Sequence, residues 1–143
     1  MASATIVYDA LILGSGPAGL AAALALSRLH RTAAIFTKPN KAGFRNEGVH
    51  AMHNVVSRDG ESPAEFRRIA TEQLKQYNTA SFIETDIVKL SKKKVGKNNS
   101  LDGFEVQDAT GQTWVGRKLA LTMGISDIFP EIEGFKENWP HNM

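Results

Sequence analysis

Apolar residues form short blocks, separated by polar turns, along the first part of the chain. The block Ile6–Leu13 has the pattern of a strand that is buried on both faces. The segment Ala18–Leu29 is rich in Ala and Leu, which favour helix, and a second apolar block, Ala33–Phe36, follows it. The chain therefore begins with a predicted β-α-β unit, whose crossover should be right-handed.

The segment 37–61 shows no regular hydrophobic period and contains Pro, Asn, Gly, Arg and two His. A loop of this length is uncommon in a compact domain unless it contributes to function. Ser62 then opens the clearest helix, because it is followed by a Pro at the first helical position and by Glu65 three residues after the cap. Apolar side chains recur at helical spacing from Phe66 to Tyr77, so we expect one buried stripe on this helix.

The second half of the chain has mainly strand patterns. The segment Phe82–Leu90 is rich in β-forming residues, and two further strands are predicted around a turn at Ala109–Gly111. The buried run Leu119–Met123 is predicted as a separate last strand, and the segment from Gly124 onward as loop. The order of these elements predicts an α/β fold with a parallel core and a short antiparallel meander.

Composition and charge exclude several classes of function. The 143 residues carry 17 basic and 15 acidic side chains, a net charge of +2, so nucleic acid is not a favoured partner. The densest basic run, Lys92–Lys97, is predicted to be a solvated hairpin tip. The sequence has no Cys, which excludes a disulfide, a thiolate metal site and a thiol nucleophile within it. Since no apolar stretch reaches about 20 residues and the start lacks a signal pattern, we expect a soluble, cytoplasmic protein with no membrane partner.

The turn "GSGPAG" lies between the first predicted strand and the first predicted helix. Gly14, Gly16 and Gly19 satisfy the pattern G-x-G-x-x-G in this context. The first glycine permits the tight turn, the second lets the backbone approach a pyrophosphate, and the third lets helix and strand pack closely. No Lys-Ser or Lys-Thr follows the turn, which excludes a P-loop. The pattern predicts a Rossmann-like β-α-β unit that binds a dinucleotide.

The position that normally binds the ribose of the dinucleotide departs from the usual pattern. An acidic residue is expected at the end of the second strand, about 20 residues after the turn. The sequence there is Phe36-Thr37-Lys38, without a carboxylate. Thr37 can make one hydrogen bond to a ribose. Lys38 and Lys41 favour a 2′-phosphate, so NADP stays open as a less favoured candidate for the dinucleotide.

Three strings of the sequence, above all "FRNEGVHAMH" and "GISDIFPEIEGF", resemble one group of proteins. They are similar to the thioredoxin-reductase-like flavoproteins of fungi, including the dithiol oxidases of epidithio-metabolite pathways such as those of gliotoxin and holomycin. The resemblance implies FAD on a fold with two dinucleotide-binding domains, homodimers, and oxidation or reduction of thiols. It also implies that residues 1–126 form the first FAD-binding segment and that residues 127–143 are a tail leading toward an NADPH-type domain.

The resemblance assigns cofactor-binding roles to the glycine turn, to the "RN" pair in the long loop, to Asp86 and Ile87, where the backbone meets the adenine, and to the turn at Thr122–Gly124 that ends the first FAD segment. Together with Thr37 at the ribose position, the expected FAD contacts are Gly14, Gly16, Pro17, Ala18, Gly19, Arg45, Asn46, Asp86, Ile87, Thr122 and Gly124. His50 and His53, three residues apart in the long loop, are the candidates for a catalytic acid or base beside the flavin. They lack a plausible third ligand, so we expect no metal.

Two family motifs are not found in this sequence, namely the redox pair C-x-x-C and the later "GD" motif that closes over the flavin. We therefore expect a truncated flavoprotein of fungal secondary metabolism, with weak or lost FAD unless a second copy or another chain completes the pocket. Dithiol exchange by this chain alone is not expected, because such exchange needs an attacking thiolate. A flavin-dependent oxidoreductase acting on a small-molecule metabolite is favoured. The alternative is a cofactor-free or non-redox protein, with an isomerase- or cyclase-type pocket or a partner-binding surface.

Overall fold

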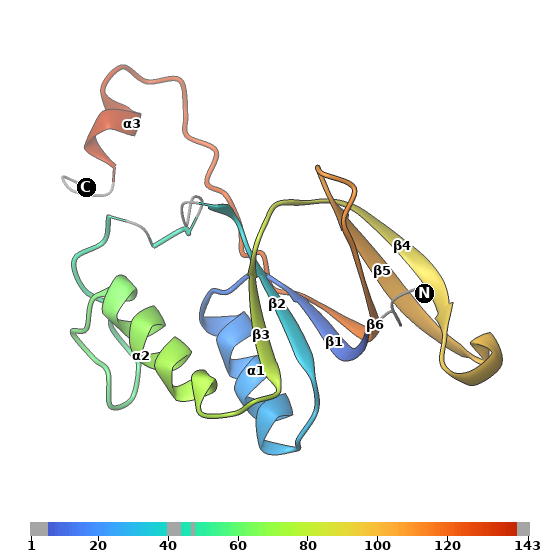
Figure 1. Ribbon diagram of the computed structural model, residues 1–143. Helices are drawn as coiled ribbons and strands as arrows, with labels where there is room; N and C mark the ends of the chain where they lie inside the picture. The colour runs from blue at the N-terminus through green and yellow to red at the C-terminus, as the bar shows by residue number, and fades with distance from the viewer. Residues whose placement is uncertain (1–5, 40–43, 47, 140–143) are drawn as a thin grey trace.

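A six-stranded mixed sheet runs through the molecule in the order β3-β2-β1-β6-β5-β4, as the computed structural model shows for residues 6–39, 44–46 and 48–139 (Figure 1). Strands β3, β2, β1 and β6 are mutually parallel, whereas β4, β5 and β6 form an antiparallel meander. The strand bounds are β1 Val7–Leu13, β2 Ala33–Thr37, β3 Ala80–Glu84, β4 Ile87–Val95, β5 Leu101–Asp108 and β6 Thr113–Leu121. The predicted α/β class, with a β-α-β unit and an antiparallel meander, is confirmed.

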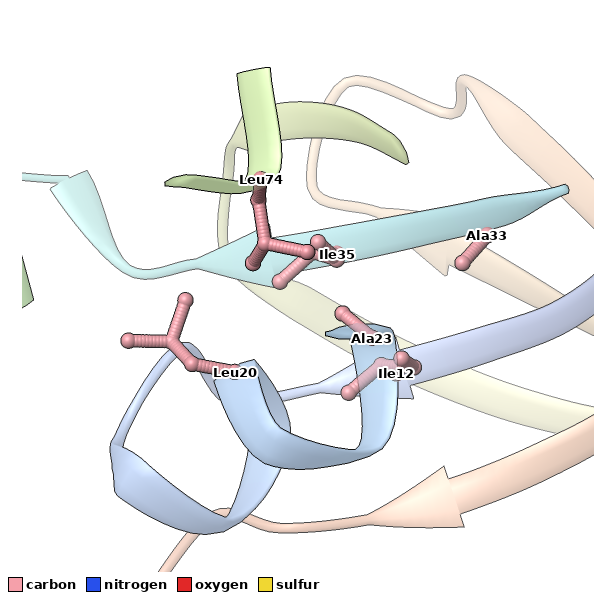
Figure 2. Close-up of a cluster of buried hydrophobic side chains, with 6 residues drawn as sticks. All are labelled: Ile12, Leu20, Ala23, Ala33, Ile35 and Leu74. Carbon is pink, nitrogen blue, oxygen red and sulfur yellow. The ribbon is translucent and has the colours of Figure 1, made fainter. Parts of the chain in front are cut away.

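Two helices cover one face of the parallel half of the sheet (Figure 1). Helix α1 spans Pro17–Arg28 and α2 spans Pro63–Lys75. Their contact layer with the sheet is a cluster of small and branched apolar side chains, in which Leu74 of α2 lies against Ile35 of β2 (Figure 2). The buried members of the cluster are Ile12, Leu20, Ala23, Ala33, Ile35 and Leu74. Small residues on α1 let the helix lie close to the strands, as its Ala-rich sequence predicts.

Helix α2 begins as its sequence predicts but is buried less than expected. The side chain of Ser62 accepts a hydrogen bond from the backbone amide of Glu65 at 3.1 Å, and a proline takes the first helical position. Of the predicted apolar stripe, only Leu74 is fully buried, while the stripe from Phe66 to Ala70 is half-buried. The expectation of a buried stripe is therefore correct only at its last turn.

The meander covers the opposite face of the same strands. Leu11 and Phe36 point to this face, where they pack with Val106 of β5. The Trp114 ring of β6 meets the Phe36 ring edge-on, with 5.2 Å between centroids and 73° between planes. Trp114 thus packs against the core cluster on this face. The first strand is buried on both faces because helices cover one side and the meander covers the other.

The strand assignments of the second half need three corrections. The predicted separate strand Leu119–Met123 is wrong, because β6 is one continuous strand that pairs with β5 in its first half and with β1 along its length. Gly116 makes this double pairing possible, since a Cβ there would lie 2.6 Å from Cγ of Leu11. The predicted segment Phe82–Leu90 is two strands, broken between Glu84 and Ile87.

The basic run Lys92–Lys97 was predicted as a solvated hairpin tip, and this is correct only at its end, because Lys92, Lys93 and Lys94 lie in the edge strand β4. The tip comes after them and contains the short 3-10 helix η2, Lys97–Asn99. Lys93 and Lys94 form ion pairs with the neighbouring strand, Lys93 with Glu105 and Lys94 with Asp102 at 2.8 Å. Lysines on an exposed edge strand disfavour pairing with another sheet.

After β6 the chain leaves the sheet and runs beyond the carboxyl ends of the parallel strands (Figure 1). This segment was predicted as loop, but it contains one helical turn, α3, Phe135–Asn138. The turn is stabilised by aromatic packing, since the rings of Phe135 and Trp139 are stacked with 6.5 Å between centroids and Phe129 contacts both. The division into a domain 1–126 and a tail 127–143 stays a prediction.

Candidate functional site

An open cleft of about 1090 Å³ lies at the carboxyl ends of β1, β2 and β6. The chain passes from β1 to β2 on one side and meets β6 on the other, so the cleft lies where the order of strands reverses. Ligands of open α/β sheets bind at such a switch point. The predicted cofactor residues that line the cleft are Gly14, Gly16, Pro17, Ala18, Thr37, Arg45, Asn46, Asp86, Ile87, Thr122 and Gly124. Gly19 is the one predicted contact that does not line it.

The glycine turn forms the floor of the cleft, and glycine stands at each of its three positions for a different structural reason. Gly14 has φ of +111°, and a Cβ on it would lie 2.4 Å from the carbonyl oxygen of Thr122. A Cβ on Gly19 would lie 1.9 Å from the carbonyl oxygen of Gly14, so this residue packs the helix against the turn. The Thr122 hydroxyl lies 2.9 Å from the carbonyl oxygens of both Leu13 and Gly14. These contacts tie the turn to the end of β6.

Gly16 differs from the other two glycines because it faces open space. A Cβ on it would meet no atom within 4 Å. It is also the N-cap of α1, and no side chain caps the helix there. The backbone amides of the first turn therefore lack intrahelical partners and lie at the positive end of the helix dipole. An anion is the ligand that such a helix end favours.

Hydroxyl groups occupy the end of β2, where an acidic residue would bind a ribose. The Thr37 hydroxyl donates a hydrogen bond to Oγ of Ser15 in the glycine turn. Lys38 follows Thr37 and also lines the cleft. The missing carboxylate is therefore a feature of the folded site as well as of the sequence.

Contacts from two other elements hold the segment 44–46 against the cleft. The Arg45 side chain lies 3.1 Å from the Asp127 carboxylate, in an ion pair that links the long loop to the segment after β6. The Arg67 side chain donates to Oδ1 of Asn46 at 3.1 Å, and its guanidinium lies 4.1 Å from the centre of the Phe44 ring. Arg67 is a residue of α2, and its guanidinium turns toward the loop.

The two candidate catalytic histidines lie outside the cleft lining. His50 and His53 are both exposed, and Nδ1 of His53 lies 3.5 Å from the Asp59 carboxylate. Asp59 also accepts a hydrogen bond from the amide of Asn54, so this contact belongs to a tight turn of the loop. The structure does not bring the histidines together with the glycine turn, and their catalytic role stays a prediction. Within the described ranges, no three His, Asp or Glu side chains gather as a metal site.

Two hydrogen-bonded carboxylates of the sheet, Asp9 of β1 and Asp108 of β5, have lowered pKa values and do not line the cleft. The backbone amide of Thr32 holds the pKa of Asp9 below its usual value, and Arg117 lies 3.2 Å from the same carboxylate. Hydrogen bonds from Thr110 and Thr85 lower the pKa of Asp108, which caps the turn between β5 and β6. Because Thr85 lines the cleft, Asp108 also helps to fix one wall. None of the helices in the described part of the chain has the length and apolarity of a membrane span.

Three residues of the site had no assigned role from sequence, namely Ser15, Arg67 and Asp127. Ser15 lies within the glycine pattern, so its place in the cleft was open to prediction. Arg67 and Asp127 lie on elements that no local pattern connects with the long loop. Only the three-dimensional arrangement shows that they hold it.

Comparisons with known proteins agree with the geometry of the cleft. Residues 8–143 match the model of the pyridine nucleotide-disulphide oxidoreductase family. The chain is 40% identical over 141 residues to thioredoxin reductase sirT of Leptosphaeria maculans, an alignment that covers 97% of this chain and 40% of that protein. It is also 40% identical over 139 residues to thioredoxin reductase aclD of Aspergillus oryzae, with 96% of this chain and 41% of that protein covered. The chain thus spans about 40% of the length of the curated relatives it matches.

Solved structures give the same result for the fold. The crystal structure of HlmI superimposes with a TM-score of 0.83 at 26% identity, over 96% of this chain and 41% of that one. An oxidoreductase from Agrobacterium tumefaciens superimposes with a TM-score of 0.80 at 27% identity, over 93% of this chain and 42% of that one.

Proposed function

Since the chain belongs to the pyridine nucleotide-disulphide oxidoreductase family, we propose that its cleft holds the adenosine and pyrophosphate of FAD. The observation that carries the proposal is the geometry at Gly16. An added Cβ there would meet no atom within 4 Å, and α1 begins at this residue without a side-chain cap. The amides of the first helical turn are therefore open to a pyrophosphate, which the helix dipole also favours.

The other cleft residues have distinct tasks in this proposal. Thr122 and the contact of Gly19 with Gly14 keep the turn in the shape that presents its amides. The backbone at Asp86 and Ile87 meets the adenine, and the segment at Asn46 lies beside the flavin. When bound, FAD supplies two-electron redox chemistry, which the side chains of this chain do not provide.

We further propose that the complete protein is a flavin-dependent oxidoreductase of fungal secondary metabolism, acting on a small-molecule metabolite. The fungal thioredoxin reductases named above support the assignment to the oxidoreductases. The 143 residues contain no Cys, so an exchange of dithiol and disulfide requires a thiolate from outside them. The cleft is open, and a second copy of the chain in a homodimer, or another chain, is the proposed source of the remaining flavin contacts.

Absorption and fluorescence titration with FAD test the first proposal. Wild-type protein should bind FAD, and Gly16→Val should weaken that binding at least tenfold, because the new side chain occupies the path of the pyrophosphate. Ala64→Val, which adds the same kind of bulk on the exposed side of α2, is the matched control and should bind like wild type. Circular dichroism should show that all three proteins are folded.

Two results of this titration would count against the proposal. A folded wild-type protein that binds no FAD at saturating concentration would refute the cofactor assignment and favour the cofactor-free alternative. Equal FAD affinity in wild type and Gly16→Val would place the ligand elsewhere.

A further inference from the structure

The two carboxylate oxygens of Asp108, at the end of β5, have separate partners. Oδ1 accepts three hydrogen bonds within the turn between β5 and β6, from the hydroxyl of Thr110 at 2.7 Å, from the amide of Thr110 at 2.9 Å and from the amide of Gln112 at 3.0 Å. Oδ2 accepts a hydrogen bond from outside the turn, from the hydroxyl of Thr85 at 3.0 Å. Asp108 is only 6% exposed. Because capping of the turn needs Oδ1 alone, it does not account for the contact of Oδ2.

Thr85 connects this carboxylate with one wall of the cleft. It lies between β3 and β4, and the segment Thr85–Ile87 lines the cleft, whereas Asp108 itself does not. The amide of Thr85 donates to the carbonyl oxygen of Thr37, at the end of β2, at 2.9 Å. The wall is therefore held from two sides, by β2 through the backbone of Thr85 and by Asp108 through its side chain.

The pairing of β4 with β5 is interrupted beside this wall. Ile87 pairs with Asp108, but the register of the two strands shifts between Ile87 and Lys89. Such an irregularity disrupts the ladder of hydrogen bonds locally. The hydrogen bond from Thr85 to Asp108 thus lies where the sheet alone holds the segment 85–87 less firmly.

We propose that Asp108 is a positioning residue for the nucleotide that the cleft binds. Through the hydroxyl of Thr85, it fixes the segment 85–87 in the place where an adenine packs against it. The inference rests on the proposed function, which puts the adenine at this wall, and adds to it a residue that lies outside the cleft. When the contact is lost, the segment samples other positions, and the apparent affinity falls with the fraction of molecules whose wall is in place.

Titration with 5′-AMP, followed by NMR of the ¹⁵N-labelled chain, tests the proposal. Thr85→Val removes the hydroxyl at nearly constant volume and should weaken binding roughly fivefold. Asp108→Ser keeps a hydroxyl that can cap the turn but removes Oδ2, and it should weaken binding by the same factor. The double variant should bind no more weakly than either single variant, because both changes remove the same contact.

Two control variants separate positioning from a general loss of stability. Thr85→Ser keeps the hydroxyl and should bind 5′-AMP like wild type. Thr110→Val removes a hydrogen bond to Oδ1 of the same carboxylate, so it should weaken the turn and leave the affinity unchanged. Hydrogen exchange of the Thr85 amide, measured without ligand, should become faster in Asp108→Ser and should stay as in wild type in Thr110→Val.

The outcomes separate this inference from the proposed function. Unchanged affinity in Asp108→Ser, an equal loss in Thr110→Val, or additive losses in the double variant would overturn the inference, and FAD binding by wild type would still leave the proposed function standing. A wild type that binds neither FAD nor 5′-AMP would refute the proposed function. In that case, faster exchange of the Thr85 amide in Asp108→Ser would support the positioning of the wall, and unchanged exchange would overturn it.

Discussion

Replacing Arg67 with Met should loosen the segment 44–46 while leaving the fold intact. The guanidinium makes a cation–π contact with Phe44 and a hydrogen bond of 3.1 Å with Asn46, so it holds the residues on both sides of Arg45. A cation–π contact at a partly exposed site contributes about 0.5 to 1 kcal/mol. A hydrogen bond from a charged donor contributes about 1.5 kcal/mol at the low end of its range, which suits a half-buried side chain. The segment should therefore lose about 2 kcal/mol of local stability.

Limited digestion with trypsin measures this loss directly, because the Arg45–Asn46 peptide bond lies between the two residues that Arg67 holds. When opening is faster than cleavage, the cleavage rate follows the population of the open segment. A loss of about 2 kcal/mol raises that population roughly 10- to 30-fold, since about 1.4 kcal/mol corresponds to a factor of ten. Mass spectrometry of the fragments should show this increase at the Arg45–Asn46 bond.

Arg68→Met is the matched control for this experiment. Arg68 is the next residue of α2, but it pairs with Glu65 at 2.6 Å and does not reach the loop. Its replacement should change cleavage after Arg45 by less than about twofold, because exposed ion pairs contribute little. Equal cleavage rates in Arg67→Met and Arg68→Met, with thermal unfolding unchanged in both, would refute the role assigned to Arg67.

Three further substitutions test the packing and the charges of the fold. Gly19→Ala should abolish cooperative thermal unfolding, because the new Cβ would lie 1.9 Å from the carbonyl oxygen of Gly14, and a normal melting curve would contradict this packing. Ser62→Ala should lower the free energy of unfolding by about 1 kcal/mol, because the cap of α2 is lost. An unchanged midpoint of chemical denaturation would show that the cap does not contribute to stability. Asp9→Asn should cost about 1 kcal/mol at neutral pH. Because the folded-state pKa of Asp9 lies below its usual value of 3.8, the stability advantage of the wild type should be complete above pH 3.8 and should be lost as the pH falls through the folded-state pKa. A stability difference that does not change with pH would show that the charge of Asp9 is not its cause.

The parts of the fold that local patterns determine could be predicted from the sequence. The cap at Ser62 and the strand, glycine turn and helix that begin the chain depend on residues within a few positions of one another. The first part of the lysine run and the last strand were assigned wrongly for a different reason. An edge strand and a solvated tip have the same charged composition, and the continuity of β6 depends on simultaneous pairing with β1 and β5. Neither feature is contained in a short window of sequence.

The residues of the candidate site also divide into those that local sequence patterns predict and those that they do not. Eleven of the twelve predicted cofactor residues line the cleft, because a β-α-β unit brings the turn after β1 and the end of β2 to one edge of the sheet. The contacts that position the long loop come from α2 and from the segment after β6, which are 21 and 82 residues away along the chain. No periodicity or motif connects residues at such separations, so the roles of Arg67 and Asp127 required the structure.

The two ends of the cleft are held by different forces, and this difference has a functional consequence. At the glycine turn, close backbone contacts around Gly14 and Gly19 leave no room for another arrangement, so the amides are fixed before a ligand arrives. At the segment 44–46, side-chain contacts hold the chain: the exposed Arg45–Asp127 pair contributes about 1 kcal/mol or less, and the contacts of Arg67 together contribute about 2 kcal/mol. A ligand therefore gains most of its affinity at the preorganised turn, where no ordering cost is incurred. The loop end can rearrange by breaking a few side-chain contacts, which suits the part of the site that meets the variable portion of a ligand. Nucleotide affinity should consequently be far more sensitive to a change at Gly16 than to a change at Arg45.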